Sequence, residues 1–184
     1  MHRLFVALRP PPPVRQALAA LQDEVAGARW QDDEQLHLTL RFVGEVERRQ
    51  AEDLAGALGE VRAAAPVLRL DGVGRFDSGH GAALWAGITP REPLAALHRK
   101  VDRVCVGVGL APERRAYLPH VTLARLERGA AAGADVERWL AQHAGLTGEP
   151  FAPSHLVLYE SRLGREGAAY EPVVRWPLAD RPDR

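Results

Sequence analysis

The chain has 184 residues, 46% of them hydrophobic, which is enough for one substantial core or for two small lobes that share a cleft. Its 24 basic and 24 acidic residues balance to zero net charge, which excludes the global positive field of a protein that coats nucleic acid or membrane surfaces. No segment approaches the roughly 18 consecutive apolar residues that a membrane-spanning helix needs. Composition therefore predicts one small globular domain, whose contacts with any RNA are local.

The first half of the chain is predicted to run strand, helix, strand, helix, strand, strand. Residues 3–9 alternate in hydrophobicity, which is typical of a strand, and four prolines end them. Apolar residues at helical spacing predict helices over about 12–26 and within about 47–62. Two further strands are predicted at 67–76 and 82–88, around the loop "DSGHG".

Between the two helices, residues 36–42 read "LHLTLRF" and alternate strictly. This alternation places the leucines and Phe42 on one face of a strand, and His37, Thr39 and Arg41 on the other. We expect the apolar face to join the core and the polar face to line a cleft or to meet solvent.

The second half repeats this order of elements. It is predicted to contain a helix over about 94–108, a strand at 120–126, a further helix around 136–140, and strands within 151–163 and 168–178 that are joined by the turn "GREG". The segment "GVG" at 107–109 is expected to cap the first of these helices.

This internal repeat, with half-repeats of about 1–90 and 91–178, predicts two similar lobes related by an approximate two-fold axis. We expect an α+β fold in which each lobe is an antiparallel sheet with outer helices, arranged around a central cleft. Such an axis brings strand 36–42 close to strand 120–126. Residues 1–184 are expected to form a single bilobal domain with a short disordered tail at 180–184.

The tetrapeptide "HLTL", which begins at His37, returns as "HVTL" at His120. The chain has only 7 His and four Thr, so a repeated His-x-Thr motif is seldom a coincidence. If the polar faces of the two motif strands confront each other, two imidazoles stand on opposite sides of a bound group. Histidine can act as general acid and general base near neutral pH, and the hydroxyls of Thr39 and Thr122 can donate to phosphate oxygens. The pattern therefore favours the opening of a cyclic phosphodiester.

Other chemistries fit the sequence less well. Each motif offers one good metal ligand, and no cluster of His, Cys, Asp or Glu stands beside it at a familiar spacing, so we expect no metal and no cofactor. Cys105 lies in an apolar helical stripe and is interpreted as a buried structural thiol. Because it is the single cysteine, it forms no internal disulfide, and a cytoplasmic location is expected.

Several other side chains are expected to have structural roles. Arg41 is interpreted as an exposed strand arginine, although it shares the face of His37. Core packing is expected for each of the aromatic residues Phe5, Phe42, Trp85 and Tyr159, although some aromatic side chain in the cleft should meet a nucleobase. The remaining histidines match no motif and are expected to be structural or solvated: His2, His80, His98, His143 and His155.

The motifs and their surroundings resemble the 2H phosphoesterase superfamily, and specifically the RNA 2',3'-cyclic phosphodiesterases once described as bacterial 2'-5' RNA ligases. The resemblance extends over almost the whole chain, through "RLFVALRPP", "QLHLTLRFVGEV", "LWAGI", "RAYLPHVTLARL" and "LVLYESRLG". It implies a two-lobed α+β fold with a central cleft. It also implies that His37 protonates the departing 3' oxygen, that His120 activates water, and that Thr39 and Thr122 contact the phosphate.

By the same resemblance, Arg125 matches a family arginine that helps to hold the phosphate. Strict alternation, however, places Arg125 on the face opposite His120, five residues earlier. The strand must end, bulge or let the side chain bend round if Arg125 is to reach the site, and otherwise Arg125 is a surface arginine.

The sequence thus predicts a metal-independent enzyme that hydrolyses 2',3'-cyclic phosphate at RNA or nucleotide ends to a 2'-phosphomonoester. By microscopic reversibility, the same site could join a cyclic end to a 5'-hydroxyl end through a 2'-5' linkage, weakly in competition with water. The alternative is a binding module for phosphorylated RNA ends that lacks turnover. The expected partners are RNA or nucleotide ends with a cyclic phosphate, and neither a membrane nor an obligate protein partner is expected.

Overall fold

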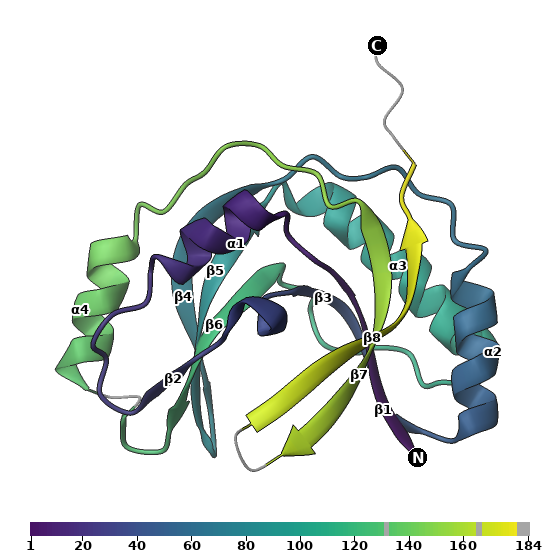
Figure 1. Ribbon diagram of the computed structural model, residues 1–184, viewed down its shortest axis with the longest axis horizontal. Coiled ribbons are helices and arrows are strands. Elements are labelled where there is room, and N and C mark those ends of the chain that lie inside the picture. The colour runs from purple at the N-terminus through teal and green to yellow at the C-terminus, as the bar shows by residue number, and fades with distance from the viewer. Residues whose placement is uncertain (131–132, 165–166, 180–184) are drawn as a thin grey trace.

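The structure, a computed structural model, describes residues 1–130, 133–164 and 167–179. In these ranges the strands are β1 (His2–Leu8), β2 (Ala28–Trp30), β3 (Leu38–Val46), β4 (Arg69–Ser78), β5 (Gly81–Thr89), β6 (His120–Glu127), β7 (His155–Gly164) and β8 (Gly167–Pro177). The helices are α1 (Pro12–Ala19), α2 (Arg48–Leu58), α3 (Arg91–Gly107), α4 (Ala134–His143) and the short 3-10 helix η1 (Asp33–Gln35). The predicted α+β class is confirmed (Figure 1).

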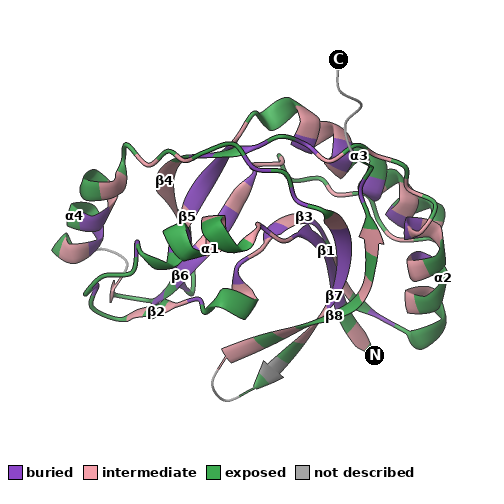
Figure 2. Cartoon of the chain, turned by 45° about the horizontal axis from the view of Figure 1, so that its top comes forward, coloured by how far each residue is buried: buried purple, intermediate pink, exposed green. Residues whose placement is uncertain are grey.

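The strands form one antiparallel sheet in the order β4-β5-β6-β3-β1-β7-β8, with β2 paired to β6. Strands β3 and β6 pair at a single position, Leu38 with Val121, so the sheet consists of two halves that are joined there. Figures 1 and 2 show α2 and α3 on the side of the half that contains β1, and α1 and α4 on the side of the half that contains β5. The predicted two-lobed architecture with outer helices is therefore confirmed.

A half-repeat of the sequence does not correspond to one lobe. The series β1-α1-β3-α2-β4 returns along the chain as β5-α3-β6-α4-β7. In each series the last strand lies with the other lobe, because β4 pairs with β5 and β7 pairs with β1. Figure 1 shows the same for the first helix of each series, α1 and α3. Residues 1–90 and 91–178 thus exchange elements across the pseudo-two-fold axis. The single bilobal domain stays a prediction, and the tail 180–184 lies outside the described residues.

One face of the sheet packs on the helices. All four α-helices contribute to one core, together with the inward-facing residues of the strands, such as Leu4 and Val6 of β1. The residues that alternate with them along β1, Phe5 and Ala7, point to the opposite face and pack on Tyr159 of β7. The alternation of β1 therefore separates the residues of the core from those on the opposite face of the sheet.

The predicted helix over 12–26 is too long, because α1 ends at Ala19. Beyond it, the N–H groups of Leu21 and Gln22 donate to carbonyls only three residues back, in tight turns. Leu21 and Val25 are nevertheless buried in the core, which explains why they continue the helical pattern. Of the predicted turn "GREG", residues 165–166 lie outside the described residues.

The predicted cap of the helix around 94–108 is confirmed. Helix α3 ends at Gly107, and Gly109 has a φ of 87°, in the left-handed region that favours glycine. The N–H of Gly109 donates to the carbonyl of Val106, and that of Leu110 donates to the carbonyl of Cys105. These two bonds form a Schellman motif, which satisfies carbonyls at the helix end.

Cys105 is buried as predicted, and burial raises the pKa of its thiol to about 11, so the thiol stays protonated. Within the described ranges, none of the helices has the length and apolar character needed to cross a membrane.

A bulge in β3 overturns the expected role of Arg41. Thr39 pairs with Ala7 of β1 and Arg41 with Val6, so Leu40 is an extra residue. The alternation reverses there, and Arg41 is only 8% exposed, whereas Phe42 is 51% exposed. The predictions of an exposed Arg41 and a buried Phe42 are therefore wrong.

Candidate active site

The two His-x-Thr motifs meet at the point that joins the two halves of the sheet. Leu38 and Val121 pair there, and both side chains are buried in the core. In an antiparallel pair, the neighbouring positions face each other in reverse order, which sets His37 opposite Thr122 and Thr39 opposite His120. Their side chains lie on the face opposite the core. The predicted residues are thus brought together, although β3 begins at Leu38, one residue after His37.

The two histidines make matching hydrogen bonds. Nδ1 of His37 lies 2.6 Å from the carbonyl oxygen of Gln35, and Nδ1 of His120 lies 2.8 Å from that of Leu118. Because a carbonyl only accepts, each Nδ1 must carry a proton and donate it. Each Nε2 then keeps its lone pair when the ring is neutral, and it is the atom that can accept or deliver a proton.

Aromatic rings hold both imidazoles in similar ways. Tyr170 meets His37 edge-on, with ring centroids 5.0 Å apart and an interplanar angle of 81°. Phe76 meets His120 in the same manner, at 4.9 Å and 82°. These two aromatic residues were missed at the sequence level, because they come from strands that are distant in the chain and match no motif. They restrict the orientation of each ring.

A second pair of aromatic residues completes these surroundings. Phe5 is buried, as predicted, and its ring centroid lies 4.8 Å from that of His37. Trp85 is only partly buried, and its ring centroid lies 6.2 Å from that of His120. Phe5 and Trp85 therefore surround the motif histidines, in addition to any packing in the core.

The pKa values of both histidines are lowered from the ordinary value. Burial is the main cause for His37, whose pKa falls to about 4, and the charges of His120 and Arg125 add to it. For His120, burial again lowers the pKa most, and the charge of Arg125 lowers it further. In both cases the hydrogen bond to a backbone carbonyl acts in the opposite direction. Both rings are neutral at pH 7 in the unliganded protein.

A bulge in β6 resolves the conflict over Arg125. Thr122 pairs with Trp85 and Ala124 with Leu84, so Leu123 is an extra residue. The alternation reverses after it, and Arg125 shares the face of Thr122. The Arg125 side chain is exposed and, in the described part of the chain, makes no hydrogen bond or ion pair. Arg125 is thus free to bind an anion.

The bulges in β3 and β6 occupy equivalent positions. Each bulged residue lies three positions after its motif histidine, at Leu40 and Leu123. Phe42, five residues after His37, is therefore the counterpart of Arg125, five residues after His120. The two ends of the cleft thus differ in chemistry, with an exposed ring on one side and a guanidinium on the other.

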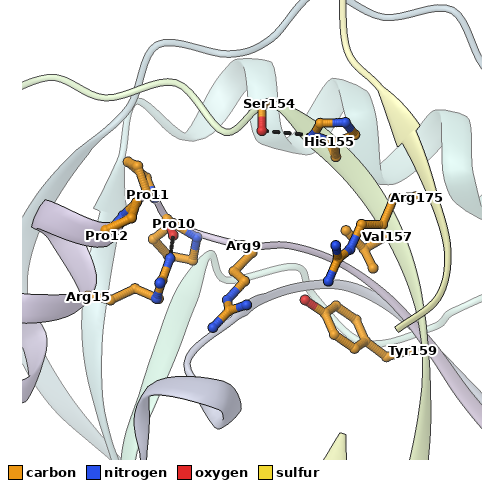
Figure 3. Close-up of a pocket in the computed structure, with 10 residues that line it drawn as sticks. All are labelled: Arg9, Pro10, Pro11, Pro12, Arg15, Ser154, His155, Val157, Tyr159 and Arg175. Atoms are coloured by element: carbon orange, nitrogen blue, oxygen red, sulfur yellow. Dashed lines mark hydrogen bonds between the residues drawn. The ribbon is translucent and has the colours of Figure 1, made fainter. Parts of the chain in front are cut away.

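A pocket of about 190 Å³ lies beside His120. Thr39 and the rings of Phe42 and Phe76 line it, as do Arg115 and Tyr117 of the segment that leads to β6. A second pocket, of about 320 Å³, includes Tyr159 (Figure 3). Among the described residues, no three His, Cys, Asp or Glu side chains come together in a group that could hold a metal ion.

The arrangement places two histidines and two threonines on one face of the sheet, where its two halves are joined. The sequence profile of the 2'-5' RNA ligase superfamily matches residues 10–165, so the chain belongs to this family of 2H phosphoesterases. The predicted resemblance is confirmed.

Known proteins of this kind are similar to the chain over most of its length. It is 28% identical to the RNA 2',3'-cyclic phosphodiesterase of Geobacillus stearothermophilus, over 97% of this chain but only 58% of that protein. It is 29% identical to the RNA 2',3'-cyclic phosphodiesterase of Aeropyrum pernix, over 84% of this chain and 90% of that one. The crystal structure of Escherichia coli LigT complexed with 3'-AMP matches 97% of this chain and 99% of its own, with a TM-score of 0.74 and 27% identity. These relatives confirm the predicted enzyme class, a phosphodiesterase.

Gly74 gives room to the Trp85 ring. A Cβ atom at Gly74 would lie 2.2 Å from an atom of that ring. We expect Gly74→Ala to displace Trp85, to lower the free energy of unfolding by about 1–3 kcal/mol and to change tryptophan fluorescence. Gly56→Ala in α2 is the control, because nothing lies within 4 Å of its new Cβ and alanine favours a helix. Equal stability of the two variants would show that Trp85 does not need this space.

Proposed function

We propose that the protein hydrolyses 2',3'-cyclic phosphate ends of RNA or nucleotides to 2'-phosphomonoesters. The pairing of Leu38 with Val121 carries this proposal, because it sets two imidazoles and two threonine hydroxyls on one face of the sheet. The names of the relatives, RNA 2',3'-cyclic phosphodiesterase, support the substrate class. A structure of the similar protein E. coli LigT is a complex with 3'-AMP, which supports the binding of a nucleotide by this protein.

In the proposed mechanism, Nε2 of His120 takes a proton from water while the water oxygen attacks the phosphorus. The bond from phosphorus to the 3' oxygen breaks, and Nε2–H of His37 gives its proton to that oxygen. The phosphate remains on the 2' oxygen. Thr39 and Thr122 donate to the non-bridging oxygens, and Arg125 balances their negative charge as it increases in the transition state. Thr39 and Thr122 have no other side-chain hydrogen bond within the described residues.

The mechanism requires His37 to be protonated, and its pKa of about 4 in the unliganded protein opposes this. A bound phosphodiester carries a negative charge close to the imidazole, and such a charge raises the pKa of histidine. Substrate binding is therefore expected to be accompanied by proton uptake.

This coupling predicts two different pH profiles. The profile of kcat/KM reports the free enzyme, in which both histidine pKa values are below 6.5, so its bell should have its maximum below pH 6.5. The profile of kcat reports the complex, in which the phosphate raises the pKa of the acid, so its maximum should lie at a higher pH. Steady-state rates from pH 4 to 9 test this. Coincident profiles would mean that the phosphate does not change the protonation of the pair.

The proposed function is tested by incubating the protein with an RNA oligonucleotide that ends in 2',3'-cyclic phosphate, with and without EDTA. A 2'-phosphate product at the same rate in both reactions is expected, because the mechanism uses only side chains of this chain. A 3'-phosphate product would contradict the assignment of the leaving oxygen. A rate that EDTA abolishes would contradict metal-independent catalysis.

Two finer predictions remain. Joining of a cyclic end to a 5'-hydroxyl end by the same site would produce a 2'-5' linkage, and we expect it to be slow in competition with water. The cytoplasmic location expected from the single cysteine also stays a prediction.

A further inference from the structure

The pocket of about 320 Å³ is rich in arginine (Figure 3), and one of its lining residues, Tyr159, lies beside His37. Its lining comes from the segment after β1, the start of α1, and strands β7 and β8. The charged or titratable side chains in it are those of Arg9, Arg15, His155, Tyr159 and Arg175. We call this group the arginine pocket.

The arginine pocket and His37 lie on the same face of the sheet. Tyr159 lines the pocket, and its ring centroid is 6.1 Å from that of His37. Leu8 of β1 pairs with Leu38 of β3. Because the strands are antiparallel, Arg9, one residue after Leu8, lies beside His37, one residue before Leu38. Neighbouring strands are about 4.8 Å apart, and a ligand held at His37 therefore comes close to Arg9.

Arg175 belongs to the same face through its cross-strand partner. It pairs with Val157 of β7, which precedes Tyr159 by two residues and thus points to the same side. Figure 3 shows the Arg9 guanidinium between those of Arg15 and Arg175. The three cations consequently surround one opening next to Tyr159.

The carboxylates of the structure offset only part of this positive charge. Asp33 accepts from Arg9 at 2.9 Å and from Arg15 at 2.8 Å, and Glu34 lies 3.2 Å from Arg9. Arg175 is exposed and makes no hydrogen bond or ion pair within the described residues. Among the residues that the structure describes, Nε of Arg9 is buried without a partner, and Nη2 is the one nitrogen of its guanidinium that donates. The pocket therefore holds guanidinium donors without acceptors, in a chain of zero net charge.

We propose that the arginine pocket is a second phosphate subsite, which binds the 5' phosphate group of the nucleotide whose cyclic phosphate lies between His37 and His120. This inference rests on the proposed function. A phosphate oxygen is the acceptor that guanidinium groups bind best, through paired N–H donors. The pocket beside His120, with the exposed rings of Phe42 and Phe76, lies on the other side and suits the nucleobase. The enzyme thereby favours the end of an RNA strand over a nucleoside cyclic phosphate.

The test compares three substrates with the same cyclic end: adenosine 2',3'-cyclic phosphate, its 5'-phosphorylated form, and the dinucleotide ApA with a 2',3'-cyclic phosphate. We expect kcat/KM to be about tenfold higher for the two substrates with a 5' phosphate group, mainly through KM. Arg175→Ala should remove most of this preference, and Arg175→Lys should restore part of it. Arg175 makes no ion pair with any described residue, so its replacement breaks none of the ion pairs that the structure describes. Arg48→Ala, an exposed arginine of α2, is the control and should leave the preference unchanged.

Each outcome has a definite meaning. No preference in the wild-type protein, or a preference that Arg175→Ala retains, would overturn the subsite. Another outcome is that added inorganic phosphate changes kcat/KM for adenosine 2',3'-cyclic phosphate while the protein shows no preference for a 5' phosphate. That result would assign the pocket to a free anion and would also overturn the proposed subsite. No turnover of any of the three substrates would refute the proposed function itself, which distinguishes that failure from the other two. An increase in salt should reduce the preference, because the attraction is between charges.

Discussion

Replacing His37 or His120 with alanine is expected to lower kcat on a 2',3'-cyclic phosphate by a factor of about 10²–10⁴ for each variant. Each imidazole performs one proton transfer, and no other side chain in the described residues stands in an equivalent position with an Nδ1–H bound to a carbonyl two residues back. The loss should appear in kcat, since Thr39, Thr122 and Arg125 remain to bind the phosphate.

The measurement is steady-state hydrolysis, with circular dichroism and urea unfolding to verify that each variant is folded. His80→Ala, in the exposed turn between β4 and β5, is the matched control and should keep the wild-type rate. If either variant at His37 or His120 keeps a near-normal kcat, the two-histidine mechanism is wrong. If the wild-type protein binds cyclic ends tightly without turnover, the chain is the binding module that the sequence also allowed.

The second large effect is expected on stability, from Arg41→Ala. Arg41 is buried, and its Nε donates to Asp102 of α3 at 2.7 Å, while its other nitrogens donate to the carbonyls of Phe42 and Ala111 and approach Glu113. Its removal leaves the Asp102 carboxylate and two carbonyls without their cation, whereas Glu113 keeps its ion pair with Arg115. Loss of one partner from such a buried network costs about 3–5 kcal/mol.

Urea unfolding measures this effect, and Arg48→Ala is its control. Arg48 also forms an ion pair, with Glu52 at 2.8 Å, but it is exposed on α2, where such pairs contribute about 0.3–0.5 kcal/mol. Similar losses in the two variants would show that burial adds nothing to the Arg41 network. Because this network ties β3 to α3 and to the segment before β6, the Arg41 variant should also raise KM.

Hydrophobic periodicity predicted most of the elements, because each strand and helix has one face in a common core. It also predicted that His37 and Thr39 share a face, since both precede the bulge at Leu40. It did not predict the bulge, which depends on how β3 fits against β1, and this is why the roles of Arg41 and Phe42 were wrong. The same kind of bulge at Leu123 had to be left open until the pairing of β5 with β6 was known.

The arrangement of the lobes was harder to predict than the elements themselves. The order of helices and strands shows a repeat, but it does not show to which half of the sheet a strand is added. Tyr170 and Phe76 reach the histidines only because β8 and β4 are placed at opposite ends of that sheet. Their part in the site depends on long-range pairing, about which local sequence patterns carry no information.

The division of labour between the histidines is tested most directly with a substrate in which sulfur replaces the 3' oxygen of the cyclic phosphate. A thiolate leaves without a proton, so this substrate needs a base but no acid. The proposed mechanism predicts that this substrate restores most of the activity of His37→Ala and none of that of His120→Ala. Restoration of His120→Ala alone would reverse the two roles, and restoration of neither variant or of both would contradict acid–base catalysis by this pair.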